Sequence, residues 1–425
     1  MSKKFLGAVA GIIMVAGGCW IAGSYYAGNI FQSQLKTFTD EIGKDSGMDV
    51  SNVKQARGLF SSKGSFKLGF KDAAADQSFR PFLETEVSYE ASHMITPDAL
   101  TKVHWQILPV GESGKVITDL FGDAAQVTGE GRIKFNQEYV SSVHVPKLVA
   151  RQDDASIDVT PTTGHFTWGK SNAALDLKTD RAIIRSDGEA FEAQQVVFET
   201  SLSDRIKGIG TAKLSVEKLA SKDGIAEGLL MTAGSTLNQD RIDVRVSKSL
   251  RSLAYQGMLA RDLAIEVVLN KVDAASVETL SKLINDTGMA NLTAIEQAQA
   301  KTATRTMLLK GFELGIPKLT GTVGKGSIEG SLRMDLLPTP GAQASQFSLT
   351  DLLTSSGQVV LKGPVLDPQY TGMALMFGAV VQTPEGLKAS YTLKNGQLKA
   401  NGQALDIKKE WAAIEQAMRT WITEQ

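Results

Sequence analysis

The chain has 425 residues, 45 basic against 46 acidic side chains, and a single cysteine. Balanced, dispersed charge excludes a basic stripe for nucleic acid, and one cysteine excludes an internal disulfide. Forty glycines against eleven prolines, with short alternating runs of Val, Ile, Thr and Leu, favour many strands joined by tight turns. The length suits two or three domains or one elongated domain.

The amino-terminal segment has the composition of a membrane anchor. Residues 5–28 contain no charged side chain, and an apolar run of about 20 residues is long enough to cross the hydrocarbon core as a helix. Lys3 and Lys4 precede the run and would hold residues 1–4 in the cytoplasm. We therefore predict a transmembrane anchor over residues 5–28, with the rest of the chain across the membrane.

Other functions of this segment stay open. The tripeptide Ala-Gly-Ser at 22–24 would permit cleavage of a secretory signal. Cys19 suggests a lipoprotein cysteine, although the leucine usually found three places upstream is missing. Gly7 and Gly11 have the spacing with which two membrane helices pack closely, which is a weak indication of self-association.

A helix and a long series of strands follow the anchor. Residues 29–43 place apolar side chains at near-helical spacing and end at a glycine, which predicts a helix packed on the following domain. Alternating runs then predict strands with one apolar and one polar face, as in an antiparallel sheet with one wet side. These runs are 65–70, 85–90, 104–108, 131–135, 165–168, 242–246, 263–269, 312–316 and 328–336.

Three further segments complete the expected architecture. Apolar spacing predicts helices over 274–285 and 292–309, which form a helical insert. The alternating residues 387–393 and 398–400 flank Asn395-Gly396, a pair that favours the type I′ turn of a hairpin.

The carboxy-terminal residues 408–423 predict an amphipathic helix. Its apolar stripe consists of Trp411, Ile414, Met418, Trp421 and Ile422. Because its basic residues are offset by acidic ones, we expect this helix to dock on protein rather than on a membrane.

The predicted fold is α+β and mostly antiparallel β: an amino-terminal transmembrane helix followed by an elongated β-rich domain with a few packing helices. Prolines and glycine at 338–341 interrupt regular structure. They divide the exported part into a β-rich region, 29–337, with its helical insert near 274–309, and a carboxy-terminal hairpin and helix region, 338–425.

The chain carries no catalytic signature. Its four histidines, His93, His104, His144 and His165, are far apart and form no zinc-binding motif. His104 and His165 are typical of ordinary strand positions. The sequence contains no nucleophile elbow and no phosphate-binding or dinucleotide-binding loop. We therefore assign no catalytic, cofactor-binding or metal-binding residue and expect a protein that is not an enzyme. An acid–base site built from carboxylates that are distant in the sequence would become visible only in the folded structure.

Three short motifs carry a resemblance to a known family. They are Arg-Gly-Leu-Phe-Ser-Ser at 57–62, Val-Leu-Asn-Lys-Val-Asp-Ala-Ala at 268–275, and the hairpin at 393–402. Together they resemble the YdgA-like family of bacterial envelope proteins over nearly the whole chain. The resemblance implies a single-pass inner-membrane protein of a Gram-negative bacterium, with most of its chain in the periplasm and with self-association as a further expectation. It implies no activity.

In the first of these motifs the residue types indicate a structural role. Gly58 allows a bend, and we expect Phe60 to be buried and Ser61 and Ser62 to satisfy backbone groups at the turn.

Two functions agree with this sequence. The first is a non-catalytic interaction or scaffold module, expected as a homodimer, that binds an envelope protein and no nucleic acid. The alternative is a carrier or chaperone for lipid or another hydrophobic ligand in an apolar groove of the β domain. Two sheets that cover each other would favour the scaffold, whereas an open apolar groove would favour the carrier.

Overall fold

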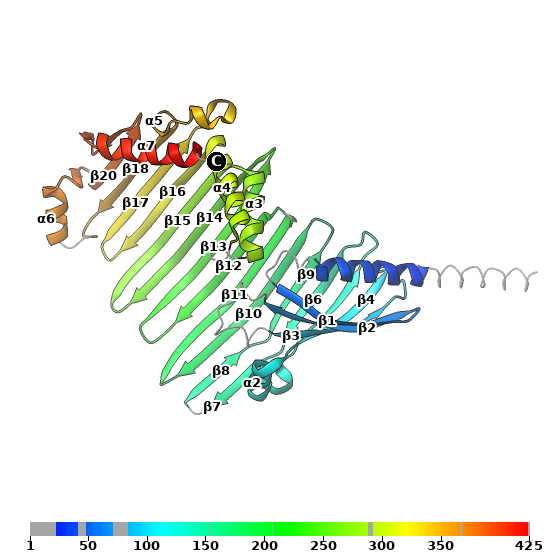
Figure 1. The fold of residues 1–425 in the computed structure, drawn as a ribbon. Helices are drawn as coiled ribbons and strands as arrows, with labels where there is room; N and C mark the ends of the chain where they lie inside the picture. The colour runs from blue at the N-terminus through cyan, green and yellow to red at the C-terminus, as the bar shows by residue number, and fades with distance from the viewer. Residues whose placement is uncertain are drawn as a thin grey trace, which may run out of the picture. The chain divides into compact units, whose positions relative to one another are not determined.

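The computed structural model describes residues 23–40, 48–70, 84–152, 154–205, 207–287, 292–365 and 368–423. These residues form a mostly antiparallel β protein with a few helices, so the predicted α+β class is confirmed (Figure 1). The chain divides into two compact units: Met1–Asp187 with Ile284–Asn291, and Gly188–Leu283 with Leu292–Gln425.

Unit 1 begins with a helix over residues 23–40, which precedes ten antiparallel strands. The labelled elements are β1 (Met48–Arg57), β2 (Ser61–Phe70), β3 (Thr85–Ser92), β4 (Thr101–Pro109), α2 (Gly111–Phe121), η2 (Gly122–Ala125), β5 (Val127–Ile133), β6 (Tyr139–Val145), β7 (Leu148–Gln152), β8 (Ala155–Val159), β9 (Thr162–Trp168) and β10 (Ala173–Ser186). Strands β1 to β6 pair in chain order, β6 then pairs with β9, and β10 pairs with β9 and, farther along, with β8.

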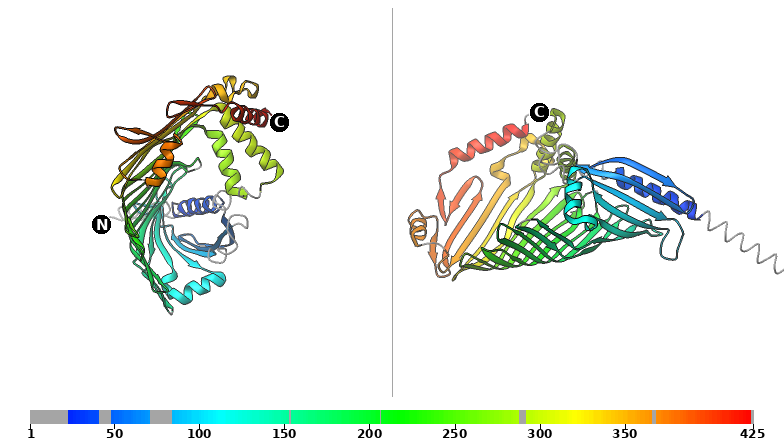
Figure 2. Two further views of the ribbon diagram at one scale, coloured as in Figure 1. Left: turned by 90° about the vertical axis from the view of Figure 1, so that its left-hand side faces the viewer. Right: turned by 90° about the horizontal axis from the view of Figure 1, so that it is seen from below.

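The core of unit 1 lies between the helix 23–40 and one face of these strands. Phe31 of the helix is buried in a cluster with Tyr89, Ala91, Val103 and Ile133. Figure 2 shows this helix, in dark blue, against the inner side of the strands of its unit. The predicted packing of residues 29–43 is therefore confirmed for residues 29–40, and residues 41–43 lie outside the described residues.

Unit 2 is a long antiparallel meander whose strands pair in chain order up to β18, which pairs with β20. Its elements are β11 (Glu189–Asp204), β12 (Ile209–Ala220), β13 (Gly224–Asn238), β14 (Arg241–Tyr255), β15 (Met258–Asp273), α3 (Ala274–Thr287), α4 (Ala294–Lys310), β16 (Phe312–Val323), β17 (Gly326–Leu336), η4 (Pro340–Ala342), η5 (Ala344–Gln346), α5 (Leu349–Leu352), β18 (Leu353–Lys362), α6 (Pro368–Met376), β19 (Val381–Thr383), β20 (Gly386–Lys394), β21 (Gln397–Ala400), β22 (Gln403–Leu405) and α7 (Lys408–Thr423).

The register of unit 2 gathers apolar side chains on one face of its strands. Leu269 pairs with Leu314, and Leu314 pairs in turn with Met334. Leu214 and Met231 pair in the same way on earlier strands. All five side chains are half-buried rather than buried.

The carboxy-terminal helix α7 docks on protein, as its charge pattern predicts. Ile422 is fully buried in a cluster with Phe347 and Leu336, and Trp411 and Met418 pack against that cluster. The expected contribution of Ile414 to the buried stripe is wrong, because this side chain is exposed.

The predicted hairpin is also confirmed. Asn395 and Gly396 have φ of 51° and 68°, which is the pair of positive values that a type I′ turn requires. Lys394 and Gln397 close the turn as paired strand ends. A Cβ atom on Gly396 would lie 2.7 Å from the indole nitrogen of Trp411, so this glycine also lets α7 approach.

Most of the predicted anchor, residues 5–22, lies outside the described residues, as does the tip 1–4. Its last residues form the first turns of the helix 23–40, where Ser24 and Ala27 are fully buried. In the described part of the chain, no helix combines the length and the apolar character needed to cross a bilayer.

The interruption at 338–341 lies inside unit 2, between the paired strands β17 and β18. The strand predicted for 131–135 ends at Ile133, and Phe135 lies exposed in the following turn.

Candidate functional site

A cavity of about 390 Å³ lies in unit 1 between the helix 23–40 and the inner face of the strands. Its volume falls within the roughly 300–1,000 Å³ of small-molecule sites. The cavity is lined by Phe31, Gln34, Leu35, Phe38, Phe66, Leu68, Val87, Tyr89, Val103, Trp105, Ile107, Val127, Ile133, Tyr139, Val143, Phe166, Trp168, Leu175 and Leu177. None of these described residues carries a charge, and Gln34 is the one amide among them.

Strand register explains why so many apolar side chains converge. Val87 of β3 pairs with Phe66 of β2 on one side and with Ile107 of β4 on the other. Paired residues point to the same face of a sheet, so the three side chains lie side by side in the cavity wall. The polar residues that alternate with them point to the opposite face.

Glycines create the space within this wall. Gly129 of β5 pairs with Trp105, and a Cβ atom on Gly129 would lie 2.3 Å from the Trp105 ring. A Cβ atom on Gly131 would lie 2.2 Å from the hydroxyl of Tyr139. Both aromatic rings therefore lie across glycine backbone, which leaves the volume above them open.

The polar groups of the wall are satisfied only in part, because the buried hydroxyl of Tyr89 has no hydrogen-bond partner among the described residues. The indole nitrogen of Trp105 donates to Ser141 Oγ at 2.7 Å, and that hydroxyl donates to the carbonyl oxygen of Ser142 at 2.9 Å. Burial raises the pKa of Tyr139 to about 12, against the opposing effect of hydrogen bonds with Ser141 and Trp105. Tyr139 is therefore neutral near neutral pH, and the cavity offers an uncharged surface.

The helix 23–40 covers the cavity through aromatic contacts. The Phe31 ring meets Tyr89 edge-on, with centroids 5.4 Å apart and an interplanar angle of 61°. About two turns later, Phe38 meets Trp168 with centroids 5.4 Å apart at 82°. The helix is thus held over strands β3 and β9, which lie on different sides of the cavity.

A buried network of hydrogen bonds fixes the helix beside the cavity. His93 Nε2 lies 2.7 Å from Ser62 Oγ, and His93 Nδ1 lies 3.3 Å from Thr101 Oγ1. Gln32 of the helix donates to the same Ser62 oxygen at 3.3 Å. Burial lowers the pKa of His93, and the positive charge of Arg57 lowers it further.

In this hydrogen-bonded network a serine hydroxyl meets a histidine imidazole, as a nucleophile meets its general base in an enzyme. The surroundings of the two groups favour a structural role instead. Ser62 and His93 are 3% and 0% exposed, so both side chains are shielded from solvent. Thr101 stands where a carboxylate would stabilise an imidazolium, and Arg57 disfavours that charge. A Cβ atom on Gly28 would lie 3.1 Å from His93, which shows how closely the helix packs here.

The motif at 57–62 contributes to the same attachment. Arg57 donates to Asn29 Oδ1 at 2.8 Å and to the carbonyl oxygen of Tyr25 at 3.2 Å, and its guanidinium lies 4.9 Å from the centre of the Tyr25 ring. The expected burial of Phe60 is wrong: it is exposed in the turn, which closes through the backbone of Gly58.

The second motif also has a structural role. Asp273 accepts hydrogen bonds from the backbone nitrogen and hydroxyl of Ser276 at the start of α3, at 3.0 and 2.7 Å, and it forms an ion pair with Lys310. Burial opposes ionisation of Asp273, but its bonds from Lys310 and Ser276 outweigh burial and lower its pKa. The motif therefore joins α3 to the end of α4.

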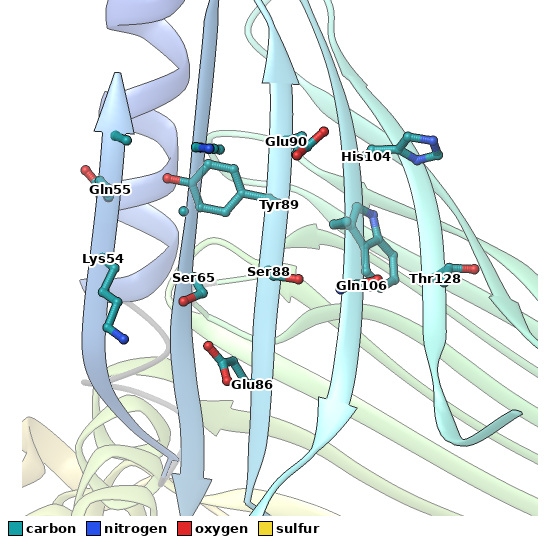
Figure 3. Close-up of a pocket in the computed structure, with 14 residues that line it drawn as sticks. Lys54, Gln55, Ser65, Glu86, Ser88, Tyr89, Glu90, His104, Gln106 and Thr128 are labelled. Carbon is teal, nitrogen blue, oxygen red and sulfur yellow. The ribbon is translucent and has the colours of Figure 1, made fainter. Parts of the chain in front are cut away.

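The opposite face of the same strands is polar. Figure 3 shows Lys54 on β1, Glu86 and Glu90 on β3, and His104 on β4. These residues line an open depression of about 830 Å³. His104 lies 3.6 Å from Glu130, and both side chains are exposed. His104 and His165 lie in β4 and β9, as expected for ordinary strand positions. Within the described ranges, no three His, Cys, Asp or Glu residues gather as metal ligands.

The fold and the site define a mostly antiparallel β protein with an apolar cavity between its strands and the helix 23–40. The family model described as "Bacterial protein of unknown function (DUF945)" matches residues 2–368, and the chain belongs to this family. No curated protein and no solved structure matches the chain.

Proposed function

We propose that the protein is a carrier for a hydrophobic ligand with an acyl chain, which it binds in the cavity of unit 1. The observation that carries this proposal is the uncharged cavity of about 390 Å³. Each methylene group of a ligand that leaves water for such a surface contributes about 0.8 kcal/mol to binding. We therefore prefer the carrier function over the scaffold function, which stays a prediction.

The proposed place of action is the periplasmic side of the inner membrane. The uncharged run at 5–28 and the two lysines before it support a single-pass anchor. The resemblance of three motifs to the YdgA-like proteins supports the same address. A carrier tethered there would have the bilayer as its source of ligand.

The protein needs no catalytic residue for this role. Helix 23–40 and the strands surround the ligand, while the buried hydrogen-bond network through His93 holds the helix in place. Phe31 and Phe38 line the side of the cavity that the helix forms, so a bound acyl chain would contact both rings.

Photo-crosslinking tests the proposal on the full chain. A palmitic acid analogue with a diazirine near the end of its chain is irradiated with the protein, and the modified residues are identified by mass spectrometry. We expect labels on inner-face residues such as Val143 and Phe166, and competition by unlabelled palmitate. Labels spread over outer-face residues such as Ser88 and Gln106, without competition, would refute the cavity as the binding site.

A further inference from the structure

The connection between β18 and β20 is much longer than the pairing of these strands requires. Leu361 pairs with Leu387, yet residues 363–385 run between the two strands and form α6 and β19. Antiparallel neighbours usually need about two to five connecting residues, and a longer connection is usually functional.

The middle of this connection, between Asp367 and Glu385, is uncharged and largely apolar. Residues 368–384 contain no Asp, Glu, Lys or Arg. Tyr370, Met376 and Phe377 are 65%, 74% and 72% exposed, and Met373 and Leu375 are exposed as well. Large apolar side chains that gather on a surface in this way mark an interaction site.

The exposed residues lie on several sides of the helix. Tyr370, Met373 and Phe377 share one side at spacings of three and four, whereas Leu375 points elsewhere. A helix that docks in a protein groove needs one apolar stripe and keeps a polar face for water. Gln369 and Thr371 interrupt the apolar surface of α6 without forming one polar face, and such a helix suits a mostly apolar surrounding.

The length of α6 restricts how it can enter such a surrounding. Nine residues span about 14 Å as a helix, and the hydrocarbon core is about 30 Å thick. The segment therefore reaches only the upper part of one leaflet. A hydrogen bond of 2.8 Å from Asn401 to the carbonyl oxygen of Gly378 ties its end to the turn beyond β21.

We propose that α6 and Phe377 form a tip that inserts into the surface of a lipid bilayer. The tip goes beyond the proposed carrier function and rests on residues of unit 2 alone. Because it has no basic side chain, insertion is driven by apolar burial, so neutral and anionic vesicles bind it alike and salt has little effect.

An environment-sensitive label tests the tip independently of the amino-terminal segment. In the full chain with Cys19→Ser, a single Met376→Cys is labelled with NBD and mixed with phosphatidylcholine vesicles. The matched control is Ile295→Cys on α4, which is 73% exposed but lies outside the tip. We expect a blue shift and at least a twofold rise in emission at 376, quenching by lipids spin-labelled high in the acyl chain, and neither effect at 295.

Three results would overturn the proposal. The first is an equal response at 376 and 295. The second is a response only with phosphatidylglycerol, which would indicate attraction by charge. The third is a shift that grows with protein concentration without vesicles, which would identify a second copy as the occupant. As a further check, Phe377→Asp in the labelled chain should reduce the vesicle response several-fold. The carrier function is unaffected by these outcomes, since its cavity lies in unit 1.

Discussion

A tryptophan in place of Val87 would fill the cavity from its strand wall. Val87 lies between Phe66 and Ile107 on the inner face, and it is half-buried. If the indole displaces about three methylene groups of a bound acyl chain, at about 0.8 kcal/mol each, the binding free energy weakens by about 2.4 kcal/mol. That loss corresponds to a roughly fiftyfold higher Kd.

The assay is a fluorescence titration of the full chain with cis-parinaric acid, which emits in apolar surroundings. The matched control is Ser88→Trp, the next residue on the same strand, which lines the polar outer face. We expect the control to leave Kd within twofold of the natural protein. Circular dichroism and Tm show whether both variants fold. A folded Val87→Trp variant with unchanged Kd, or an equal loss in both variants, would refute binding in this cavity.

Three further predictions concern stability. Phe31→Ala should lower the free energy of unfolding of unit 1 by about 3 kcal/mol, the low end for this change, because the ring already borders a cavity; a loss below about 1 kcal/mol in urea denaturation would contradict its role in holding the helix. His93 has a folded pKa below its unfolded value, so the unfolded chain takes up the extra proton and stability falls as pH drops below about 6.5, with a slope of at most about 1.4 kcal/mol per pH unit. His93→Asn should remove that component between pH 7.5 and 5.5, and an unchanged slope would refute it. Asp273→Asn should cost about 2 kcal/mol, less than the loss at a fully buried pair, since the Lys310 side chain is 34% exposed; equal urea midpoints would show that the pair adds nothing.

Local patterns in the sequence predict a part of the fold. Alternation identifies nine of the strands between 65 and 336 but misses β1, β6 to β8 and the long strands β10 to β13, while Asn395-Gly396 identifies the β20–β21 hairpin and the apolar stripe identifies α7. Each of these signals lies within one segment, where side-chain periodicity and turn chemistry decide the structure. The exposure of Ile414 shows the limit of such a stripe, because docking uses only the part of it that reaches a partner surface.

The cavity could not be predicted because it depends on pairing across the chain. Phe66 and Leu177 line the same space from β2 and β10, and only the register of the intervening strands brings them together. The pairing of Trp105 with Gly129 likewise has no local signature. The burial of His93 depends on how closely the helix packs at Gly28. Sequence reasoning found the apolar faces of the strands but not what lies between them and the helix.

Native mass spectrometry with lipid extraction tests carriage of a ligand most directly. The full chain is purified from the bacterial envelope, beside the Val87→Trp and Ser88→Trp variants prepared in the same way. Binding in the cavity predicts about one acyl-chain lipid per molecule in the natural protein and in Ser88→Trp, with little or none in Val87→Trp. An empty natural protein, or the same lipid load in all three, would contradict it.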